Sequence, residues 1–208
     1  MKVLVFDTET TGLPTERNAS IYHEEKWPYI IQLSYIIYCT ETNKMTIIND
    51  YINIPDSVKI SKESQDIHKI SRETLKTGID IENALKKFNY YSNNSELVVG
   101  HNVSFDKRML MVEGIRNKIR VDISESYCTM KNSIELCKIE KISRDGEKYY
   151  KYPTLSELYK KLFDIIPKNT HDALIDNLIC MRCFCKMELK KDISEINEEI
   201  RQLLKNVN

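Results

Sequence analysis

No stretch of this 208-residue sequence is apolar over the roughly 18 residues that a membrane-spanning helix needs. The apolar stretch at the N-terminus ends at Asp7, which makes it too short for a secretory signal. A surplus of positive charge is also missing, because Lys and Arg total 31 and Asp and Glu total 31. Proteins that coat nucleic acid non-specifically usually carry such a surplus, so any contact with nucleic acid must be local. We therefore expect an intracellular protein, cytoplasmic or, in a eukaryote, nuclear, with no membrane contact.

The sequence has no internal repeat and no low-complexity tract. Its apolar and charged fractions, 41% and 30%, are those of a globular protein and not of a disordered one. The length fits one large domain, or one domain followed by a tail.

A second pair of cysteines at metal-binding spacing is missing as well. Cys180, Cys183 and Cys185 form a C-x-x-C-x-C pattern, but a tetrahedral zinc site needs a further pair. The surrounding residues 174–189 have a helical pattern, and free cysteine is a common small buried residue. We interpret these cysteines as buried helix residues, with a metal or redox role as the alternative.

Strands and helices alternate along the chain, which predicts a layered α/β architecture. Residues 2–7 form an apolar run that ends in an acid, a pattern typical of a buried strand. Thr154 and Glu157 have the spacing of a capping box at the start of a helix. The other expected strands cover residues 30–38, 45–54 and 97–100, and the expected helices cover residues 61–67, 81–91, 104–113, 154–163 and 174–189.

Two segments nearer the C-terminus differ sharply in polarity. Residues 138–151 are polar and charged, with a turn at Asp145 and Gly146. In residues 193–207 the apolar side chains recur along one side of a helix. These side chains are Ile193, Ile196, Ile200, Leu203, Leu204 and Val207. We expect this helix to pack on its own domain, and docking to a partner chain is the alternative.

Asp7 and Glu9 follow the first apolar strand, at the edge where open α/β sheets place their ligands. Because they are two residues apart, extended backbone points both carboxylates to the same side. Two buried carboxylates repel each other, and a hard divalent cation such as Mg²⁺ relieves that repulsion. Two solvated surface acids are the alternative interpretation. The pair also comes close to the D-x-D-x-T motif of aspartyl-phosphate phosphatases, although the second acid here is Glu.

Two further segments carry candidate functional residues. Residues 100–106 end a strand in glycine and polar residues, and Asp106 falls near the start of the next helix, where a carboxylate is stabilised. His171 and Asp176 are five residues apart, so they do not share a helix face if both are helical. They can meet if His171 lies in the loop before the helix and Asp176 lies one turn inside it. A helix-start acid and a capping histidine are the alternatives.

Together, the order and content of the three segments resemble the DEDDh 3′→5′ exonucleases, the family of the bacterial polymerase III epsilon proofreading subunit. That family has the motifs D-x-E, H-N-x-x-F-D and H-x-x-x-x-D. This sequence supplies them, without departure at any catalytic position, as Asp7 and Glu9, then His101, Asn102, Phe105 and Asp106, then His171 and Asp176. The related class with tyrosine four residues before the last acid is excluded, because that position is Asp172.

The resemblance covers residues 2–188 and implies an RNase-H-like α/β fold, a mixed sheet of about five strands flanked by helices. It implies an exonuclease domain at residues 1–190, followed by a C-terminal amphipathic helix or tail at residues 191–208. It also implies two-metal hydrolysis of phosphodiester bonds, which releases nucleoside monophosphates from a 3′ end. The implied ligands of two Mg²⁺ or Mn²⁺ ions are Asp7, Glu9, Asp106 and Asp176. His171 would act as the general base, a role that requires neutral imidazole.

The implied substrate is a single-stranded or frayed 3′ end, of DNA in preference to RNA, and a proofreading role would need a polymerase as a partner in trans. The implied substrate-binding residues are Thr10 near the 3′ hydroxyl, Leu13 wedged between terminal bases, and His101, Asn102 and Phe105 along the strand. Core packing is the alternative for Leu13 and Phe105, and His68 is interpreted as structural. The alternative function is a catalytically inactive nucleic-acid-binding or polymerase-accessory module, and the complete set of acids argues against it.

Overall fold

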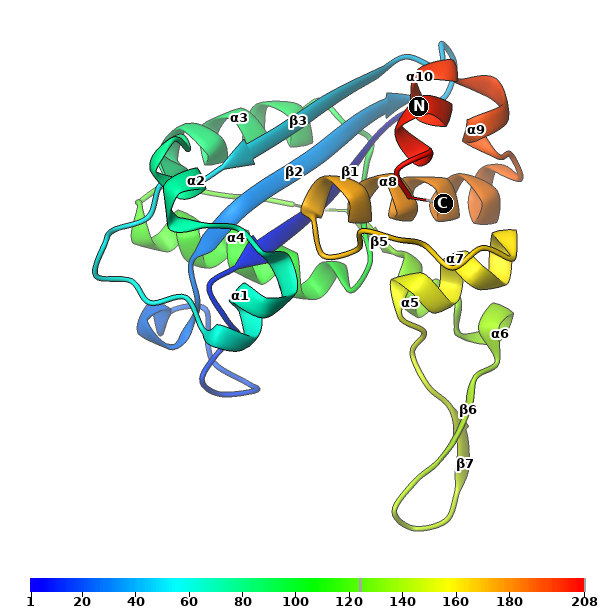
Figure 1. The fold of residues 1–208 in the computed structure, drawn as a ribbon, viewed down its shortest axis with the longest axis horizontal. Coiled ribbons are helices and arrows are strands. Elements are labelled where there is room, and N and C mark those ends of the chain that lie inside the picture. The colour runs from blue at the N-terminus through cyan, green and yellow to red at the C-terminus, as the bar shows by residue number, and fades with distance from the viewer. Residues whose placement is uncertain (124, 208) are drawn as a thin grey trace.

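A five-stranded mixed sheet runs through the centre of the protein (Figure 1). The structure is a computed structural model that describes residues 1–123 and 125–207. The strand order is β3-β2-β1-β4-β5, in which β2 is antiparallel to both β3 and β1, and β4 and β5 run parallel to β1. The strands are β1 (Lys2–Thr10), β2 (Ile30–Cys39), β3 (Met45–Tyr51), β4 (Leu97–Gly100) and β5 (Ser126–Cys128).

The central strand β1 is buried on both faces, because alternate side chains point to opposite sides of a sheet. Leu4 and Phe6 belong to one core cluster, whereas Val3 and Val5 belong to another. Helices cover both faces of the sheet (Figure 1). The helices of the first cluster are α3 (Ile81–Asn93) and α4 (Val103–Arg116), and those of the second are α7 (Leu155–Phe163), α8 (Ala173–Phe184), α9 (Ile193–Ile196) and α10 (Glu198–Leu204). The connections carry the short helices η1 (Glu24–Lys26), α1 (Lys62–His68) and α2 (Arg72–Lys76).

This architecture confirms the predicted fold class, a mixed α/β sheet of about five strands flanked by helices. The capping box of α7 is also present, since Thr154 and Glu157 satisfy each other's backbone N–H groups. The strand expected to end at residue 54 instead ends at Tyr51. There the Tyr51 carbonyl accepts a hydrogen bond from Ile79 N at 2.9 Å. The approach depends on Gly78, since a Cβ at that position would lie 2.5 Å from the same oxygen.

The C-terminal tail forms two short helices, so the prediction of one continuous helix over residues 193–207 was wrong. Asn197 has extended backbone angles (φ −133°, ψ 114°), and its side chain accepts a hydrogen bond from Ile200 N to begin α10. Asparagine is a strong N-cap residue, and this local signal outweighs the continuous apolar pattern. Ile193, Ile200 and Leu204 are buried in the second core cluster, so the tail packs on its own chain. Residue 208 of the predicted tail lies outside the described residues.

The three clustered cysteines are buried. The helix expected over residues 174–189 is α8 followed by a π-helical turn, η2 (Cys185–Leu189). Cys180, Cys183 and Cys185 are free thiols in the second core cluster. Across residues 1–123 and 125–207, the group of side chains arranged to hold a metal ion contains no cysteine. The structure therefore favours the interpretation of buried helix residues.

A two-stranded hairpin projects from the rest of the protein, below α5 and α6 in Figure 1. Its turn was predicted from the sequence but its strands were not, because the segment lacks the apolar alternation of a half-buried strand. These elements are α5 (Thr129–Asn132), α6 (Ile134–Cys137), β6 (Glu140–Ile142) and β7 (Lys148–Tyr150). Among all the described helices, none is long and apolar enough to cross a membrane.

Candidate active site

Asp7 and Glu9 lie near the end of β1, on the face that α8 covers. They share that face with Val3 and Val5, as the two-residue period of a strand requires. The first turn of α8 brings Asp176 to the same place. One carboxylate oxygen from each of Asp7, Glu9 and Asp176 lies within 4.8 Å of the other two. Residues from the first and last predicted motifs, far apart in the sequence, thus meet at one point.

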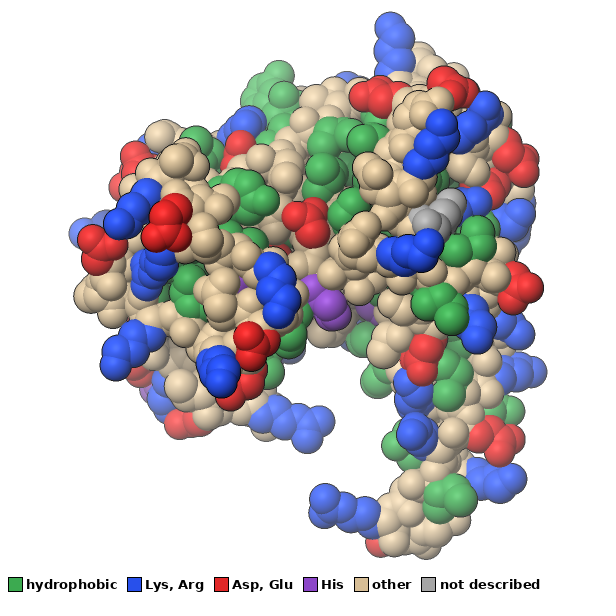
Figure 2. All heavy atoms as spheres, in the orientation of Figure 1, with side chains coloured by type: hydrophobic (Ala, Val, Ile, Leu, Met, Phe, Trp, Pro, Cys, Tyr) green, Lys and Arg blue, Asp and Glu red, His purple; other side chains and the backbone are tan. Residues whose placement is uncertain are grey.

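The start of α8 places His171 and Asp176 in the arrangement that lets residues of this spacing meet. His171 lies in the loop with a left-handed backbone (φ 71°), and Asp176 lies one turn inside the helix. The N-cap between them is Asp172, whose Oδ1 accepts from Leu174 N at 3.0 Å and Ile175 N at 3.2 Å. His171 N donates to Asp176 Oδ2 at 3.2 Å, which holds the exposed histidine beside the acids. Figure 2 shows histidine side chains reaching the surface in the hollow of the molecule.

The fourth predicted acid, Asp106, reaches the site from the first turn of α4 and is only 3% exposed. Its Oδ1 accepts two hydrogen bonds from Thr8, from the hydroxyl at 2.7 Å and from the backbone N at 3.2 Å. Asp106 is not part of the closest group of three carboxylates, but its charge acts on Asp7 and Glu9. All four predicted ligands are therefore in electrostatic contact.

Burial and mutual repulsion disfavour the charged forms of these acids. Burial raises the pKa of Asp7 well above its ordinary value, and the charges of Asp106, Asp176 and Glu9 raise it further. Burial, followed by the charges of Asp176 and Asp106, raises the pKa of Glu9 to about 8. The pKa values of Asp106 and Asp176 are also raised, mainly by burial, and for Asp106 the hydrogen bond from Thr8 opposes the shift.

The donor set fits a divalent cation. Asp176 Oδ1 is buried, and no other described residue offers it a hydrogen bond. A buried carboxylate oxygen without a hydrogen-bond partner destabilises the folded protein, and so does a cluster of acids that repel one another when charged. Carboxylate oxygens are the ligands that Mg²⁺ and Mn²⁺ prefer, and a bound cation would both satisfy this oxygen and offset the repulsion.

A cavity of about 470 Å³ opens beside Glu9. Thr10, Leu13 and Phe105 line it, together with Ile67 and His68 of α1. Leu13 and Ile67 are 78% and 51% exposed, so core packing does not explain Leu13. The cavity thus presents apolar walls next to the acids.

Residues 4–184 match the RNase_T exonuclease family model. The chain belongs to this exonuclease family. The match ends within the last turn of α8, so it includes all three motifs and the carboxylate group. No curated protein sequence gives a significant match.

Solved nucleases have the same fold. Cell-death related nuclease 4 has a TM-score of 0.67 and 16% identity, over 91% of this chain and 64% of that one. E. coli exonuclease I in complex with a dA16 oligonucleotide has a TM-score of 0.64 and 17% identity, over 98% of this chain and 45% of that one. The nuclease domain of 3′hExo, a DEDDh family member bound to rAMP, has a TM-score of 0.63 and 15% identity, over 92% of this chain and 94% of that one. The chain spans less than two thirds of the length of the first two, and the fold is that of a DEDDh exonuclease.

Two of the predicted substrate-binding residues of this exonuclease-family chain lie outside the cavity beside Glu9. Asn102 has a left-handed backbone (φ 63°) and precedes α4, and its side chain makes no capping hydrogen bond. The His101 ring bonds at both nitrogens, Nε2 to Pro153 O at 3.1 Å and Nδ1 to Thr129 Oγ1 at 3.0 Å. Because a carbonyl only accepts, Nε2 carries the proton, and burial lowers the pKa of His101 to about 4. The His101 side chain therefore links the segment after β4 to Thr129 and to Pro153.

Three further residues that shape the site, Thr8, Asp172 and His68, could not be assigned to it from the sequence. Thr8 holds Asp106, and the signal for this is its place on β1 between the two acids. Asp172 caps α8 and adds a further negative charge near Asp7 and Glu9. His68 was interpreted as structural, and its Nδ1 does accept from Ile70 N at 2.9 Å. Its Nε2 is buried and has no partner among the described residues, although the side chain lines the cavity. Only the folded structure places His68 beside this cavity.

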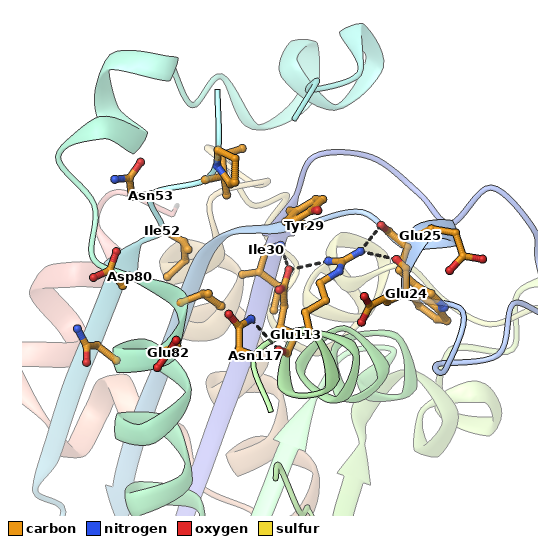
Figure 3. A pocket seen from close by; sticks show the side chains of 16 residues that line it. Glu24, Glu25, Tyr29, Ile30, Ile52, Asn53, Asp80, Glu82, Glu113 and Asn117 are labelled. Atoms are coloured by element: carbon orange, nitrogen blue, oxygen red, sulfur yellow. Dashed lines mark hydrogen bonds and ion pairs between the residues drawn. The ribbon is translucent and has the colours of Figure 1, made fainter. Parts of the chain in front are cut away.

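The loop that carries Leu13 is held to α4 by Arg116. This guanidinium donates to the carbonyl oxygens of Glu24, Trp27 and Pro28 at 2.5, 2.6 and 2.8 Å, and it pairs with Glu113 at 2.9 Å. A separate cavity of about 890 Å³ lies along this contact, with Glu24, Tyr29 and Glu113 around it (Figure 3). None of the four predicted metal ligands lines it. Its polar groups hold the loop of Leu13 in place. Because the other cavity adjoins the acids and this one does not, the cavity beside Glu9 is the candidate active site.

Proposed function

We propose that this protein is a metal-dependent 3′→5′ exonuclease that releases nucleoside monophosphates from nucleic-acid 3′ ends. The observation that carries the proposal is the approach of the Asp7, Glu9 and Asp176 carboxylates to within 4.8 Å, beside an apolar cavity. Membership of an exonuclease family supports the same reaction class.

In this proposal Asp7, Glu9, Asp106 and Asp176 hold two Mg²⁺ or Mn²⁺ ions. When bound, these cations would supply positive charge to hold the scissile phosphate and to stabilise the charge that develops on it. Asp106 would bind a cation mainly through Oδ2, because its Oδ1 already accepts two hydrogen bonds from Thr8.

His171 is the proposed general base. It would accept a proton from the attacking water, whose oxygen bonds to phosphorus as the bond to the 3′ oxygen of the preceding nucleotide breaks. The departing oxygen then takes a proton from solvent. Support for this role comes from the exposure of His171 and from its backbone hydrogen bond to Asp176, which keep it at the edge of the acids with access to water.

The terminal nucleotide would occupy the cavity beside Glu9. Leu13 and Ile67 are exposed apolar walls against which unstacked bases can pack, and such stacking tolerates any base. The His68 side chain lines the same cavity, and its buried Nε2 has no partner among the described residues. The preference for DNA over RNA and the polymerase partner remain predictions, since E. coli exonuclease I is seen with a dA16 oligonucleotide and the 3′hExo nuclease domain with rAMP.

The test is a time course on 5′-labelled single-stranded DNA and RNA, with Mg²⁺, with Mn²⁺ and with EDTA. We expect a ladder that shortens from the 3′ end only when the cation is present. Asp176→Asn should lower the rate by more than about a hundredfold, because loss of a direct ligand should exceed the 10- to 100-fold cost typical of outer-shell partners. Asp56→Asn, at an exposed loop position, is the matched control and should retain full activity.

Intact substrate with every cation, from protein shown to be folded, would instead support the inactive binding or accessory module. Normal turnover by Asp176→Asn would refute the assignment of the metal ligands. The same gel distinguishes DNA from RNA as the preferred substrate.

A further inference from the structure

The hairpin formed by β6 and β7, residues 138–152, has an unusual surface for an element that projects from the rest of the protein (Figure 1). Its strands pair with each other and with no other described strand. Two-stranded hairpins are marginally stable in water, yet this one exposes four large side chains. Ile142, Tyr149, Tyr150 and Tyr152 are 69%, 51%, 39% and 53% exposed. Clusters of this kind mark interaction surfaces on soluble proteins.

The charge on the hairpin indicates what the surface binds. Residues 138–152 contain five Lys and Arg and three Asp and Glu, in a chain whose overall charge is zero. Lys148 is paired with Glu140 at 3.3 Å, and Lys151 with Glu157 at 2.6 Å. Lys141 and Arg144 are exposed and have no acidic partner among the described residues. Within the described part of the chain Lys138 is unpaired as well, and so are the acids Asp145 and Glu147, so the unpaired groups of the hairpin carry a small net positive charge that lies among aromatic side chains.

Both faces of the hairpin combine the two kinds of side chain. Lys141 is directly opposite Tyr149 in the strand pairing, so this lysine and tyrosine share a face. Tyr150 lies on the other face, with Ile142 and Lys148, and Tyr152 follows the end of β7. Interleaved aromatic and basic side chains are what single-stranded nucleic acid requires, because bases stack on rings while phosphates contact cations.

The base of the hairpin is attached to the candidate active site. Tyr152 is followed by Pro153, whose carbonyl oxygen accepts the hydrogen bond from His101 Nε2 at 3.1 Å. His101 directly follows β4, the parallel neighbour of the strand that carries Asp7. The hairpin therefore starts at the sheet edge where the acids lie and extends outward. Figure 2 shows Lys and Arg side chains on both sides of the hollow between the hairpin and the opposite part of the protein.

We propose that the β6–β7 hairpin is a binding arm for the single-stranded nucleic acid that lies 5′ of the terminal nucleotide. The inference rests on the proposed function for its substrate class, but it concerns a surface that the catalytic motifs do not include. The arm contributes affinity for long strands and takes no part in the chemistry. A strand too short to leave the carboxylate site does not reach it.

The test compares binding and hydrolysis for two lengths of oligothymidylate, about four and about sixteen nucleotides, the range typical of single-strand binding grooves. Binding is measured in EDTA by fluorescence anisotropy, so that it does not depend on turnover. We expect the triple variant Tyr149→Ala, Tyr150→Ala, Tyr152→Ala to bind the long oligomer about five- to a hundredfold more weakly, from the loss of one stacked base or more. Hydrolysis of the short oligomer in Mg²⁺ should be unchanged.

Control variants separate stacking from charge and from loss of the hairpin fold. The corresponding triple Tyr→Phe variant keeps the rings and should retain the affinity. Tyr90→Ala removes a still more exposed tyrosine from α3 and should have no effect. Lys141→Ala with Arg144→Ala should lower the salt dependence of long-oligomer binding by about one to two phosphate contacts.

Unchanged binding of the long oligomer by the triple Ala variant would overturn the inference. So would a dimeric protein that becomes monomeric in this variant while its binding stays the same, because a second copy of the chain would then cover the hairpin. Absence of hydrolysis by every protein would count against the proposed function alone, since the EDTA binding measurement would still test the arm.

Discussion

Thr8 donates both its hydroxyl and its backbone N–H to one oxygen of Asp106, at 2.7 and 3.2 Å. Oδ1 of Asp106 is thereby committed to the neighbouring strand, and Oδ2 is the oxygen left for a cation. These bonds also oppose the rise that burial causes in the pKa of Asp106. A residue between the two acids of the first motif thus positions the acid of the second.

Thr8→Val should therefore weaken catalysis without unfolding the protein. The variant keeps the volume and the backbone bond but loses a hydrogen bond to a charged group, a contribution of about 1.5–3 kcal/mol. We expect kcat/KM to fall by about tenfold or more and the required Mg²⁺ concentration to rise. Thr8→Ser keeps the hydroxyl and should remain within about twofold of the unmodified protein. Equal activity of the Val and Ser variants would show that the hydroxyl has no such role.

Stability of the metal-free protein should depend on pH in a direction opposite to that given by carboxylates paired with cationic groups. The folded-state pKa of Glu9 is raised to about 8, and that of Asp7 is raised as well. An acid whose pKa is raised by folding binds its proton more tightly in the folded protein. The stability that it contributes is therefore greatest at low pH, and it falls as the pH rises from the pKa of the unfolded chain, about 4, to the folded-state pKa of Glu9, about 8. In EDTA we expect a higher Tm at mildly acidic pH than at pH 8.

Adding Mg²⁺ should reverse this dependence. A cation binds the charged acids, so its stabilising effect should be larger at about pH 8 than at mildly acidic pH, where protons compete with it. Differential scanning fluorimetry across pH, with and without Mg²⁺, measures both trends. An identical Mg²⁺-induced shift in Tm at every pH would contradict the assignment of these acids as ligands.

His171→Ala should lower kcat by about 10²- to 10⁴-fold, the usual contribution of a general base. The loss should shrink when the reaction is run at higher pH, because hydroxide then replaces the base. His23→Ala is the matched control, since His23 is also an exposed loop histidine, and its kcat should be unchanged. Rates of the unmodified enzyme that are equal under mildly acidic and mildly alkaline conditions would argue against a titrating histidine.

Leu13→Ala should affect substrate handling and leave stability intact. Leu13 is 78% exposed, so its truncation removes little buried apolar surface. If the side chain separates the terminal bases, kcat/KM should fall by about five- to a hundredfold, the cost of losing one stacking contact. The loss should be greater on a duplex end than on a single strand. Ile166→Ala, at another exposed position outside the cavity, should show neither effect.

The parts of the site that could be predicted from sequence are those fixed by local geometry. Alternation along a strand places Asp7 and Glu9 on one side, and the five-residue spacing places His171 before α8 and Asp176 within it. These relations depend on backbone periods, which are the same in every protein. The meeting of these acids at one edge was implied by family resemblance and not by the sequence pattern alone.

What could not be predicted depends on contacts between distant segments. The proximity of α1 to Glu9, which makes His68 a wall of the cavity, has no local signal. The hairpin strands were missed because a strand exposed on both faces lacks the alternation that identifies one. Even the broken tail had a cue, Asn197, but its apolar neighbours follow a continuous helical period that conceals the break.

Arg116 holds the loop of Leu13 through the carbonyl oxygens of Glu24, Trp27 and Pro28, which every amino acid possesses. These three hydrogen bonds therefore place no demand on the side chains of the residues that accept them, although the Arg116 guanidinium also lies over the Tyr29 ring, 4.0 Å from its centroid. Substitutions among the exposed residues of the loop can accumulate without releasing it from α4. Such a loop can change at its exposed side chains while the acids of β1 and α8 keep their positions.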